Sequence, residues 1–156
     1  MYKRQLLIHS GNSAEDISHV LDNLRSQGCE IIGCTRLQEM YSIDRAATED
    51  DWSTEYLDKK ITDKIVDNIE ESVEHINKYS SGHTESCLSD NQEAIQYFFQ
   101  NCKSAILMNN ASTQFADGGE FGFGAEIGIS TGKMHARGPI GLEQLTTFKY
   151  LSLIHI

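Results

Sequence analysis

Short apolar runs alternate with amphipathic segments over the first hundred or so residues, and this alternation limits the fold more than any other feature of the sequence. The runs expected to form buried strands lie at 6–8, 30–32, 61–66, 87–88 and 104–108. Segments with apolar residues three and four positions apart follow several of these runs, which is the spacing of one helix face. Strands that alternate with helices predict a largely parallel α/β sheet.

The expected helices have recognisable ends. Gly28 is expected to end the first helix, because glycine readily adopts the left-handed conformation found there. The acidic stretch 44–58 has no clear periodicity and is expected to be mostly loop. The expected N-terminal caps of the three helices are Ser13, Asp67 or Asn68, and Asp90 paired with Glu93 as a capping box.

Charge and composition exclude several classes of protein. The formal net charge of −10 argues against nucleic acid or an anionic membrane as the main partner. With 39% hydrophobic residues the chain belongs to the globular class, and no apolar run approaches membrane-spanning length. The cysteines form no CxxC pair, so we expect no metal site and a reduced, cytosolic set: Cys29, Cys34, Cys87 and Cys102.

The glycine-rich stretch 118–141 contains a Gly-Lys pair that invites comparison with a phosphate loop. The Walker pattern needs glycine five positions before that pair and a hydroxyl residue directly after it. Ile127 and Met134 occupy those positions, and Ile127 also stands where the dinucleotide fingerprint needs its third glycine. Both nucleotide-loop interpretations fail. The glycines of this stretch are expected to allow close packing, and Lys133 is expected to face solvent.

The two ends of the chain resemble translated adapter DNA. The string GTG-TAT-AAG-AGA-CAG encodes MYKRQ if GTG is the start codon, and its reverse complement encodes Leu151 to His155. That string resembles the transposon end used in sequencing libraries. Residues 1–5 and 151–156 are therefore expected to be foreign, with natural sequence between them that continues beyond both cuts.

Residues 109–150 carry a specific resemblance. Asn110-Ala-Ser-Thr113, Phe121-Gly-x-Gly-Ala-Glu126 and His135-Ala-Arg-Gly-Pro139 resemble the C-terminal region of the γ-glutamyl phosphate reductase family, also called glutamate-5-semialdehyde dehydrogenases. The segment 55–83 resembles the same family more loosely. The resemblance implies an aldehyde-dehydrogenase-like catalytic portion at 6–108, followed at 109–150 by a substrate-anchor loop, the glycine-rich segment and a C-terminal oligomerisation segment.

The resemblance also implies an activity. Enzymes of this family use NADPH to reduce γ-glutamyl phosphate to glutamate 5-semialdehyde with release of phosphate, in proline synthesis from glutamate. A cysteine thiolate attacks the acyl phosphate and gives a thioester. In the family that cysteine precedes a Leu-Leu-x-His strand, which here is Leu6-Leu7-Ile8-His9. The nucleophile is thus expected upstream of Leu6, so the chain alone is expected to be inactive. The dinucleotide-binding domain is expected further upstream.

The resemblance assigns candidate binding residues. Glu55 occupies the position of a glutamate that hydrogen-bonds the nicotinamide ribose, although an acid in an acidic loop is more often only solvated. For the far end of the substrate, the loop residues expected to anchor it are Asn110, Ser112 and Thr113; the alternative is a turn whose hydroxyls bond local backbone. Gln114 replaces an arginine expected there.

His135 and Arg137 form the last pair of candidates. They are expected to bind the phosphate or a carboxylate, and Arg137 is the stronger candidate because its planar fork is always charged. The alternative is an arginine that bridges subunits or ties down backbone carbonyls.

The implied partners are the substrate, a second copy of the enzyme and a transient contact with glutamate 5-kinase. Two other proteins remain consistent with the sequence. One is the reductase half of a kinase–reductase fusion of the pyrroline-5-carboxylate synthase type. The other is a non-enzymatic acidic α/β module that binds anions.

Overall fold

The computed structural model describes residues 5–153, and the chain forms two compact units. The first unit contains the residues up to Ser81 together with Asn91–Cys102. The second unit contains Gly82–Asp90 and the residues from Lys103 onward. The chain therefore passes between the units three times. Residues 1–4 and 154–156, which fall within the expected adapter sequence, lie outside the described residues.

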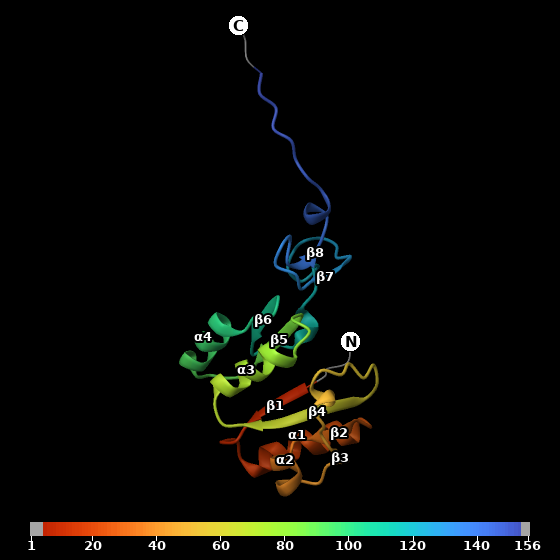
Figure 1. Cartoon of the computed structure of the whole chain (residues 1–156), viewed down its shortest axis with the longest axis vertical. Coiled ribbons are helices and arrows are strands. Elements are labelled where there is room, and N and C mark those ends of the chain that lie inside the picture. Colours follow the sequence, from red (N-terminus) through yellow and green to blue (C-terminus); the bar gives the residue numbers. More distant parts are fainter. Residues whose placement is uncertain (1–4, 154–156) are drawn as a thin grey trace. The chain divides into compact units, whose positions relative to one another are not determined.

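A parallel sheet of four strands forms the centre of the first unit, in the order β1-β4-β2-β3 (Figure 1). The strands are β1 (Gln5–His9), β2 (Glu30–Gly33), β3 (Arg45–Ala46) and β4 (Lys60–Val66). Every pairing in this sheet is parallel. The predicted parallel α/β architecture is confirmed.

The helices of the first unit are α1 (Ala14–Ser26), α2 (Thr35–Met40), α3 (Ile69–Tyr79) and α4 (Gln92–Asn101). Two of the expected caps are present, because Ser13 Oγ accepts from Asp16 N at 3.1 Å and Asn68 Oδ1 accepts from Glu71 N at 2.7 Å. Gly28 adopts a φ of 75° just beyond α1, as expected of its C-terminal glycine.

Two helix predictions need correction. The cap of α4 is Asn91, whose Oδ1 accepts from the backbone of Glu93 and Ala94 at 2.9 and 3.2 Å; the expected capping box from Asp90 to Glu93 is wrong by one residue. Helix α2 was also not predicted. That helix has six residues and buries only Leu37, which is too little for an apolar periodicity to emerge.

The core of the first unit lies between the sheet and the helices α1 and α2. Its buried members, all aliphatic, are Ile8, Ile17, Leu21, Ile31, Leu37, Ile61 and Ile65. The opposite face of β4 looks toward α3, where Lys64 Nζ lies 2.9 Å from Glu71 Oε1. Residues 61, 63 and 65 of β4 share the core face because side chains alternate along a strand.

That alternation places a carboxylate among the aliphatic side chains. Asp63 is fully buried, with an exposed fraction of 0%, and it pairs with Leu6 of β1 and Gly33 of β2. Neither of its carboxylate oxygens has a hydrogen-bond partner. Burial raises the pKa of Asp63 to about 7, and the positive charge of Arg25 opposes this only in part. The burial of this residue, which interrupts an otherwise apolar strand face, was not predicted from the sequence.

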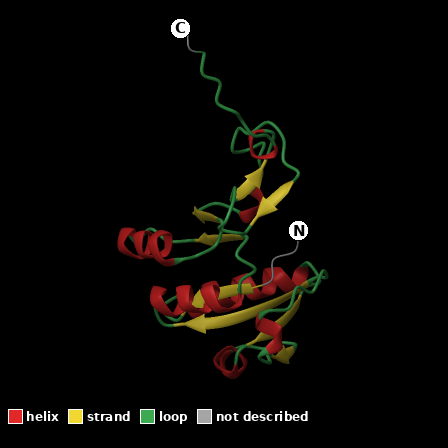
Figure 2. Ribbon diagram, turned by 45° about the horizontal axis from the view of Figure 1, so that its top comes forward, coloured by secondary structure: helices red, strands yellow, loops and turns green. Residues whose placement is uncertain are grey.

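The second unit contains two short strand pairs, which Figure 2 shows in yellow. Strand β5 (Thr84–Cys87) runs parallel to β6 (Ile106–Asn109), and β7 (Gly128–Ser130) runs antiparallel to β8 (Gly138–Ile140). The strand expected at 87–88 thus ends where it was expected to begin. Residues 146–153 adopt neither helix nor strand. Within residues 5–153, no helix has the length and apolar character needed to cross a bilayer.

Candidate functional site

The candidate residues are divided between the two units. Glu55 belongs to the first unit, in the connection between β3 and β4 that contains the single-turn helix η1 (Asp50–Trp52). The other candidates belong to the second unit: Asn110, Ser112, Thr113, His135 and Arg137. Glu55 and the other candidates therefore have separate surroundings, one set in each unit.

Glu55 presents an exposed carboxylate that has no hydrogen-bond or ion-pair partner within the described part of the chain. The residues on either side of it are bonded. Thr54 Oγ1 donates to the Asp50 carbonyl at 2.8 Å, and Tyr56 Oη donates to Asp51 Oδ1 at 2.7 Å. Glu55 thus lies between two residues whose side chains are bonded, while its own carboxylate is exposed, which suits a group that accepts hydrogen bonds from a ligand.

A pocket of about 370 Å³ lies between this connection and α3. Three rings line it: His75 packs edge-on against Trp52 at 5.0 Å and lies 4.7 Å from Tyr79. Charged side chains complete the lining, namely Glu49, Lys64, Glu71, Glu74 and Lys78.

His75 lies buried in this pocket, and its ring is held by Gln5. Gln5 Nε2 donates to the Trp52 carbonyl at 2.5 Å, so the Gln5 Oε1 atom faces His75 Nε2 at 2.6 Å. Because Oε1 can only accept, His75 carries its proton on Nε2. Burial lowers the pKa of His75 to about 4, and the nearby charge of Lys64 adds to this shift. His75 is a neutral hydrogen-bond donor at physiological pH.

In the second unit, Asn110 follows β6 directly and adopts a left-handed φ of 51°. Its side chain is engaged at both ends, since Oδ1 accepts from Ser89 N at 2.9 Å and Nδ2 donates to the Ser89 carbonyl at 3.0 Å. Asparagine tolerates this backbone conformation better than most residues. The amide of Asn110 is therefore occupied in joining two loops.

The hydroxyls after Asn110 are differently placed. Ser112 caps the short helix η2 (Thr113–Phe115) by accepting from Gln114 N at 3.2 Å, and it remains exposed. Thr113 is half-buried and Gln114 is exposed. Ser112 thus carries out the local backbone role that was the alternative to substrate anchoring, while its hydroxyl stays accessible.

His135 and Arg137 lie in the connection between β7 and β8, and both are exposed. Arg137 Nη2 donates to the Lys103 carbonyl just before β6. Arg137 also lines a pocket of about 350 Å³ with Phe121, Phe123, Pro139 and residues 105–107. Arg137 therefore does tie down a carbonyl, while its remaining N–H groups adjoin a cavity.

The glycine-rich segment packs around Glu126. Its Oε2 accepts from Gly118 N at 2.7 Å, and a Cβ atom at Gly118 would lie 2.9 Å from the Glu126 Cβ. Gly141 is equally constrained, since a Cβ there would lie 2.8 Å from the Ala125 carbonyl oxygen. Close backbone packing is what these glycines were expected to allow.

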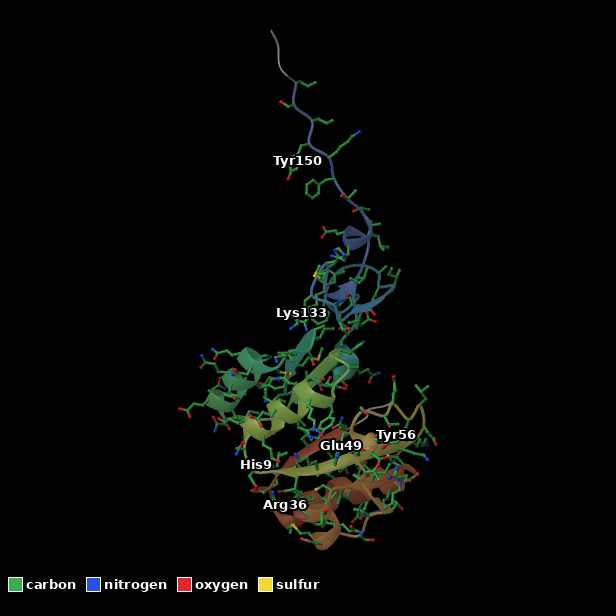
Figure 3. All side chains as sticks on the ribbon, in the orientation of Figure 1. His9, Arg36, Glu49, Tyr56, Lys133 and Tyr150 are labelled. Atoms are coloured by element: carbon green, nitrogen blue, oxygen red, sulfur yellow. The ribbon has the colours of Figure 1, made fainter. Side chains whose placement is uncertain are left out.

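The Gly-Lys pair lies in the connection between two antiparallel strands, away from any helix start. Lys133 is exposed there, as Figure 3 shows. Phosphate loops need the N-terminus of a helix behind them, so this geometry agrees with the failure of the Walker pattern. Three or more potential metal ligands are not grouped anywhere within residues 5–153.

Three of the four cysteines are poor nucleophiles as placed. Burial raises the pKa of Cys29 and of Cys87, which disfavours the reactive thiolate. Cys102 is buried at the end of α4.

Sequence reasoning missed Asp51 and the ring cluster around His75. Asp51 looks like one more acid in an acidic stretch, and only its burial at 6% exposure sets it apart. His75 and Trp52 are separated by more than twenty positions, so no local pattern joins them.

Comparison with known proteins gives a consistent result. No family model matches the chain. A γ-glutamyl phosphate reductase of Brucella anthropi is 54% identical over 145 residues, which cover 93% of this chain and 34% of that protein. A γ-glutamyl phosphate reductase of Thermoanaerobacter sp. is 51% identical over 148 residues, which cover 95% of this chain and 36% of that protein.

Solved structures agree with these relatives. The γ-glutamyl phosphate reductase of Thermotoga maritima superposes with a TM-score of 0.90 at 47% identity, over 97% of this chain and 37% of that one. The γ-glutamyl phosphate reductase of Saccharomyces cerevisiae superposes with a TM-score of 0.54 at 29% identity, over 76% of this chain and 31% of that one. The chain spans about a third of the length of the curated relatives it matches. Over that third, the chain belongs to the γ-glutamyl phosphate reductase family.

Proposed function

We propose that these residues are part of an NADPH-dependent reductase that converts γ-glutamyl phosphate to glutamate 5-semialdehyde and phosphate, in proline synthesis from glutamate. The observation that carries the proposal is the identity of 54% over 93% of the chain with a reductase of that name. The superposition on the Thermotoga maritima reductase supports it independently.

Within this proposal, Glu55 accepts hydrogen bonds from the nicotinamide ribose. Its carboxylate is exposed, and the side chains of Thr54 and Tyr56 on either side are bonded, which suits an acceptor for the ribose hydroxyls. The cofactor supplies the hydride when bound. Hydrogen bonds to a charged group are stronger than neutral ones, so the contact favours one orientation of the nicotinamide end.

The second unit is proposed to hold the substrate. Ser112 and Thr113 offer hydroxyls to the glutamyl end, and Arg137 offers guanidinium donors to the phosphate or a carboxylate, with His135 beside it. Asn110 is proposed to act indirectly: its amide bonds the Ser89 backbone and so holds in place the loop that carries the two hydroxyls.

The nucleophilic thiolate is proposed to lie outside the chain. The raised pKa values of Cys29 and Cys87 support this, since both thiols stay protonated near neutral pH. Catalysis then needs residues from the remaining two thirds of the enzyme.

Three features of the whole enzyme belong to the same proposal. Exposed apolar side chains near the end of the segment expected to be natural, Phe148 and Tyr150, support a homo-oligomer. An acyl phosphate hydrolyses readily, which favours direct transfer from glutamate 5-kinase. The thiols Cys29, Cys34 and Cys87 suit the reducing cytoplasm.

The experiment compares the purified chain with a full-length reductase that carries these residues. NADP reduction is measured with glutamate 5-semialdehyde and phosphate. The full-length enzyme should turn over, and the chain alone should not exceed a blank. Turnover by the chain alone would refute the external nucleophile, and an inactive but folded full-length enzyme would refute the proposed reaction.

A further inference from the structure

Asp51 is the centre of a hydrogen-bond network in the connection between β3 and β4. Its carboxylate accepts five hydrogen bonds: two from the Arg45 guanidinium at 2.8 and 2.5 Å, two from Thr48 N and Oγ1 at 2.7 and 2.6 Å, and one from Tyr56 Oη at 2.7 Å. An ionised carboxylate has about four lone-pair positions and accepts only, so this one is saturated.

The network reaches the middle of the sheet. Tyr56 has one hydroxyl proton and gives it to Asp51, so Thr62 Oγ1 must be the donor in its 2.8 Å contact with Tyr56 Oη. Thr62 belongs to β4 and is fully buried. Arg45 belongs to β3, and its Nε lies 3.6 Å from Glu30 Oε1 on β2. Asp51 thereby links the connection to three strands.

Glu55 lies inside the stretch that this network fixes. Tyr56 follows it directly, and Thr54 before it bonds the Asp50 carbonyl within η1. Leu57 then adopts a left-handed φ of 51° with 77% of its surface exposed. A leucine seldom holds such a conformation unless its surroundings impose it. The exposed leucine contributes little packing there, so the constraint comes from the neighbouring bonded residues. Figure 3 marks Tyr56 in this connection.

We propose that Asp51 is a positioning residue that, through Tyr56, holds Glu55 ready for the nicotinamide ribose. The inference rests on the function proposed above, because it presupposes that Glu55 meets the cofactor. Asp51 contacts no substrate and no reacting atom. Because the network already restrains the Glu55 backbone in the free enzyme, less conformational entropy is lost when the cofactor binds. This is the general basis of preorganisation.

The pKa values agree with this role. Arg45 holds the pKa of Asp51 far below its usual range, so the acceptor stays ionised at any pH at which the enzyme works. Burial raises the pKa of Tyr56, which keeps the hydroxyl protonated as a donor. The network thus has one fixed arrangement of protons.

The test is a double-mutant cycle in a full-length reductase that carries these residues, with Glu55→Gln, Asp51→Asn and the double variant. If Asp51 acts through Glu55, each single change should lower kcat/KM for NADPH by about tenfold or more, and the double variant should be no worse than Glu55→Gln alone. KM for γ-glutamyl phosphate should stay within about twofold. Losses that multiply in the double variant would overturn the inference.

Two further variants separate positioning from folding. Tyr56→Phe deletes only the linking hydroxyl, leaves the Arg45–Asp51 pair intact and should reproduce part of the Asp51→Asn loss. Asp50→Asn is the matched control. Asp50 is the exposed neighbouring acid, and only its backbone carbonyl accepts hydrogen bonds here, from the hydroxyls of Ser53 and Thr54. This variant should leave the kinetics unchanged.

Trp52 gives an independent readout in the 156-residue chain, because it is the sole tryptophan and belongs to η1. Acrylamide should quench its fluorescence more in Asp51→Asn than in the parent or in Asp50→Asn. Equal quenching in all three would overturn the inference. A flat kinetic result for Glu55→Gln would instead refute the cofactor contact, and with it any role of Asp51 in cofactor use, whatever the fluorescence shows.

Discussion

Asn110 and the backbone of Ser89 form a reciprocal pair of hydrogen bonds, with the Ser89 N–H donating to Asn110 Oδ1 at 2.9 Å and Asn110 Nδ2 donating to the Ser89 carbonyl at 3.0 Å. The pair joins the residues after β5 to those after β6, at the carboxyl ends of two parallel strands. Ligands of open α/β sheets bind at that edge. The amide of Asn110 therefore helps to shape that edge.

Replacing Asn110 by alanine should destabilise the second unit by about 1–3 kcal/mol, since it removes both Asn110–Ser89 hydrogen bonds and places alanine at a positive φ. Asn110→Gly relieves the backbone strain and should lose less. Urea denaturation, together with hydrogen exchange at the Ser89 amide, measures both effects. Equal stability of all three proteins would show that the pair contributes nothing.

Asp63 should make the fold less stable as the pH rises. Its folded pKa of about 7 exceeds the ordinary value of 3.8, so the folded state binds the proton more tightly than the unfolded state between these limits. The contribution of Asp63 to the free energy of unfolding is therefore greatest below about pH 4, and it declines as the pH rises to about 7. At about 1.4 kcal/mol per pKa unit, the full span is on the order of 4 kcal/mol.

The variant that checks this is Asp63→Val, which suits the apolar strand face. It should be more stable than the parent near neutral pH, and the difference should shrink toward pH 4. Urea midpoints at several pH values measure it. A difference that stays constant with pH would mean that Asp63 is ionised in the folded protein.

His75 should have the opposite pH dependence. Its folded pKa of about 4 lies below the ordinary 6.5, so the unfolded state binds the proton more tightly and stability is lost as the pH falls through this range. Asp63 gains stability over nearly the same range, so the two effects partly cancel in the parent protein. His75→Gln should therefore expose the Asp63 effect as a steeper loss of stability with rising pH.

A direct measurement is the NMR titration of the His75 ring. Its signals should remain those of the neutral Nε2–H tautomer down to about pH 5, whereas an exposed histidine titrates near 6.5. Midpoint titration above pH 6 would contradict the buried, Gln5-bonded geometry.

Arg137 should influence substrate binding beyond its bond to Lys103. One guanidinium N–H reaches the Lys103 carbonyl, and the group has five, so donors remain for an anion at the adjoining pocket. In a full-length reductase, Arg137→Met should raise KM for phosphate in the reverse reaction about tenfold or more. Lys133→Met is the control, because Lys133 is an exposed cation of the same connection. The same rise in both variants would indicate a nonspecific charge effect.

Sequence patterns predicted those parts of the fold that depend on local periodicity. Strands β1, β2 and β4 follow from short apolar runs, and the caps Ser13 and Asn68 follow from short polar residues before apolar segments; β3 lies in the stretch expected to be mostly loop. Asp63 could not be foreseen, because its burial is decided by register with β1 and β2. The five-bond network of Asp51 depends on a chain path that no propensity encodes. The site residues came from resemblance, and their roles stay predictions.

The three passages of the chain between the two units have a consequence for proteolysis. A protease that cuts after Ser81, after Asp90 or after Cys102 severs only one of three covalent links. The two units remain joined by the two uncut links, because α4 is part of the first unit. A single cut also leaves α4 covalently joined to the second unit on at least one side. Nicked chains should accordingly migrate as one species under native conditions and separate into pieces only when denatured.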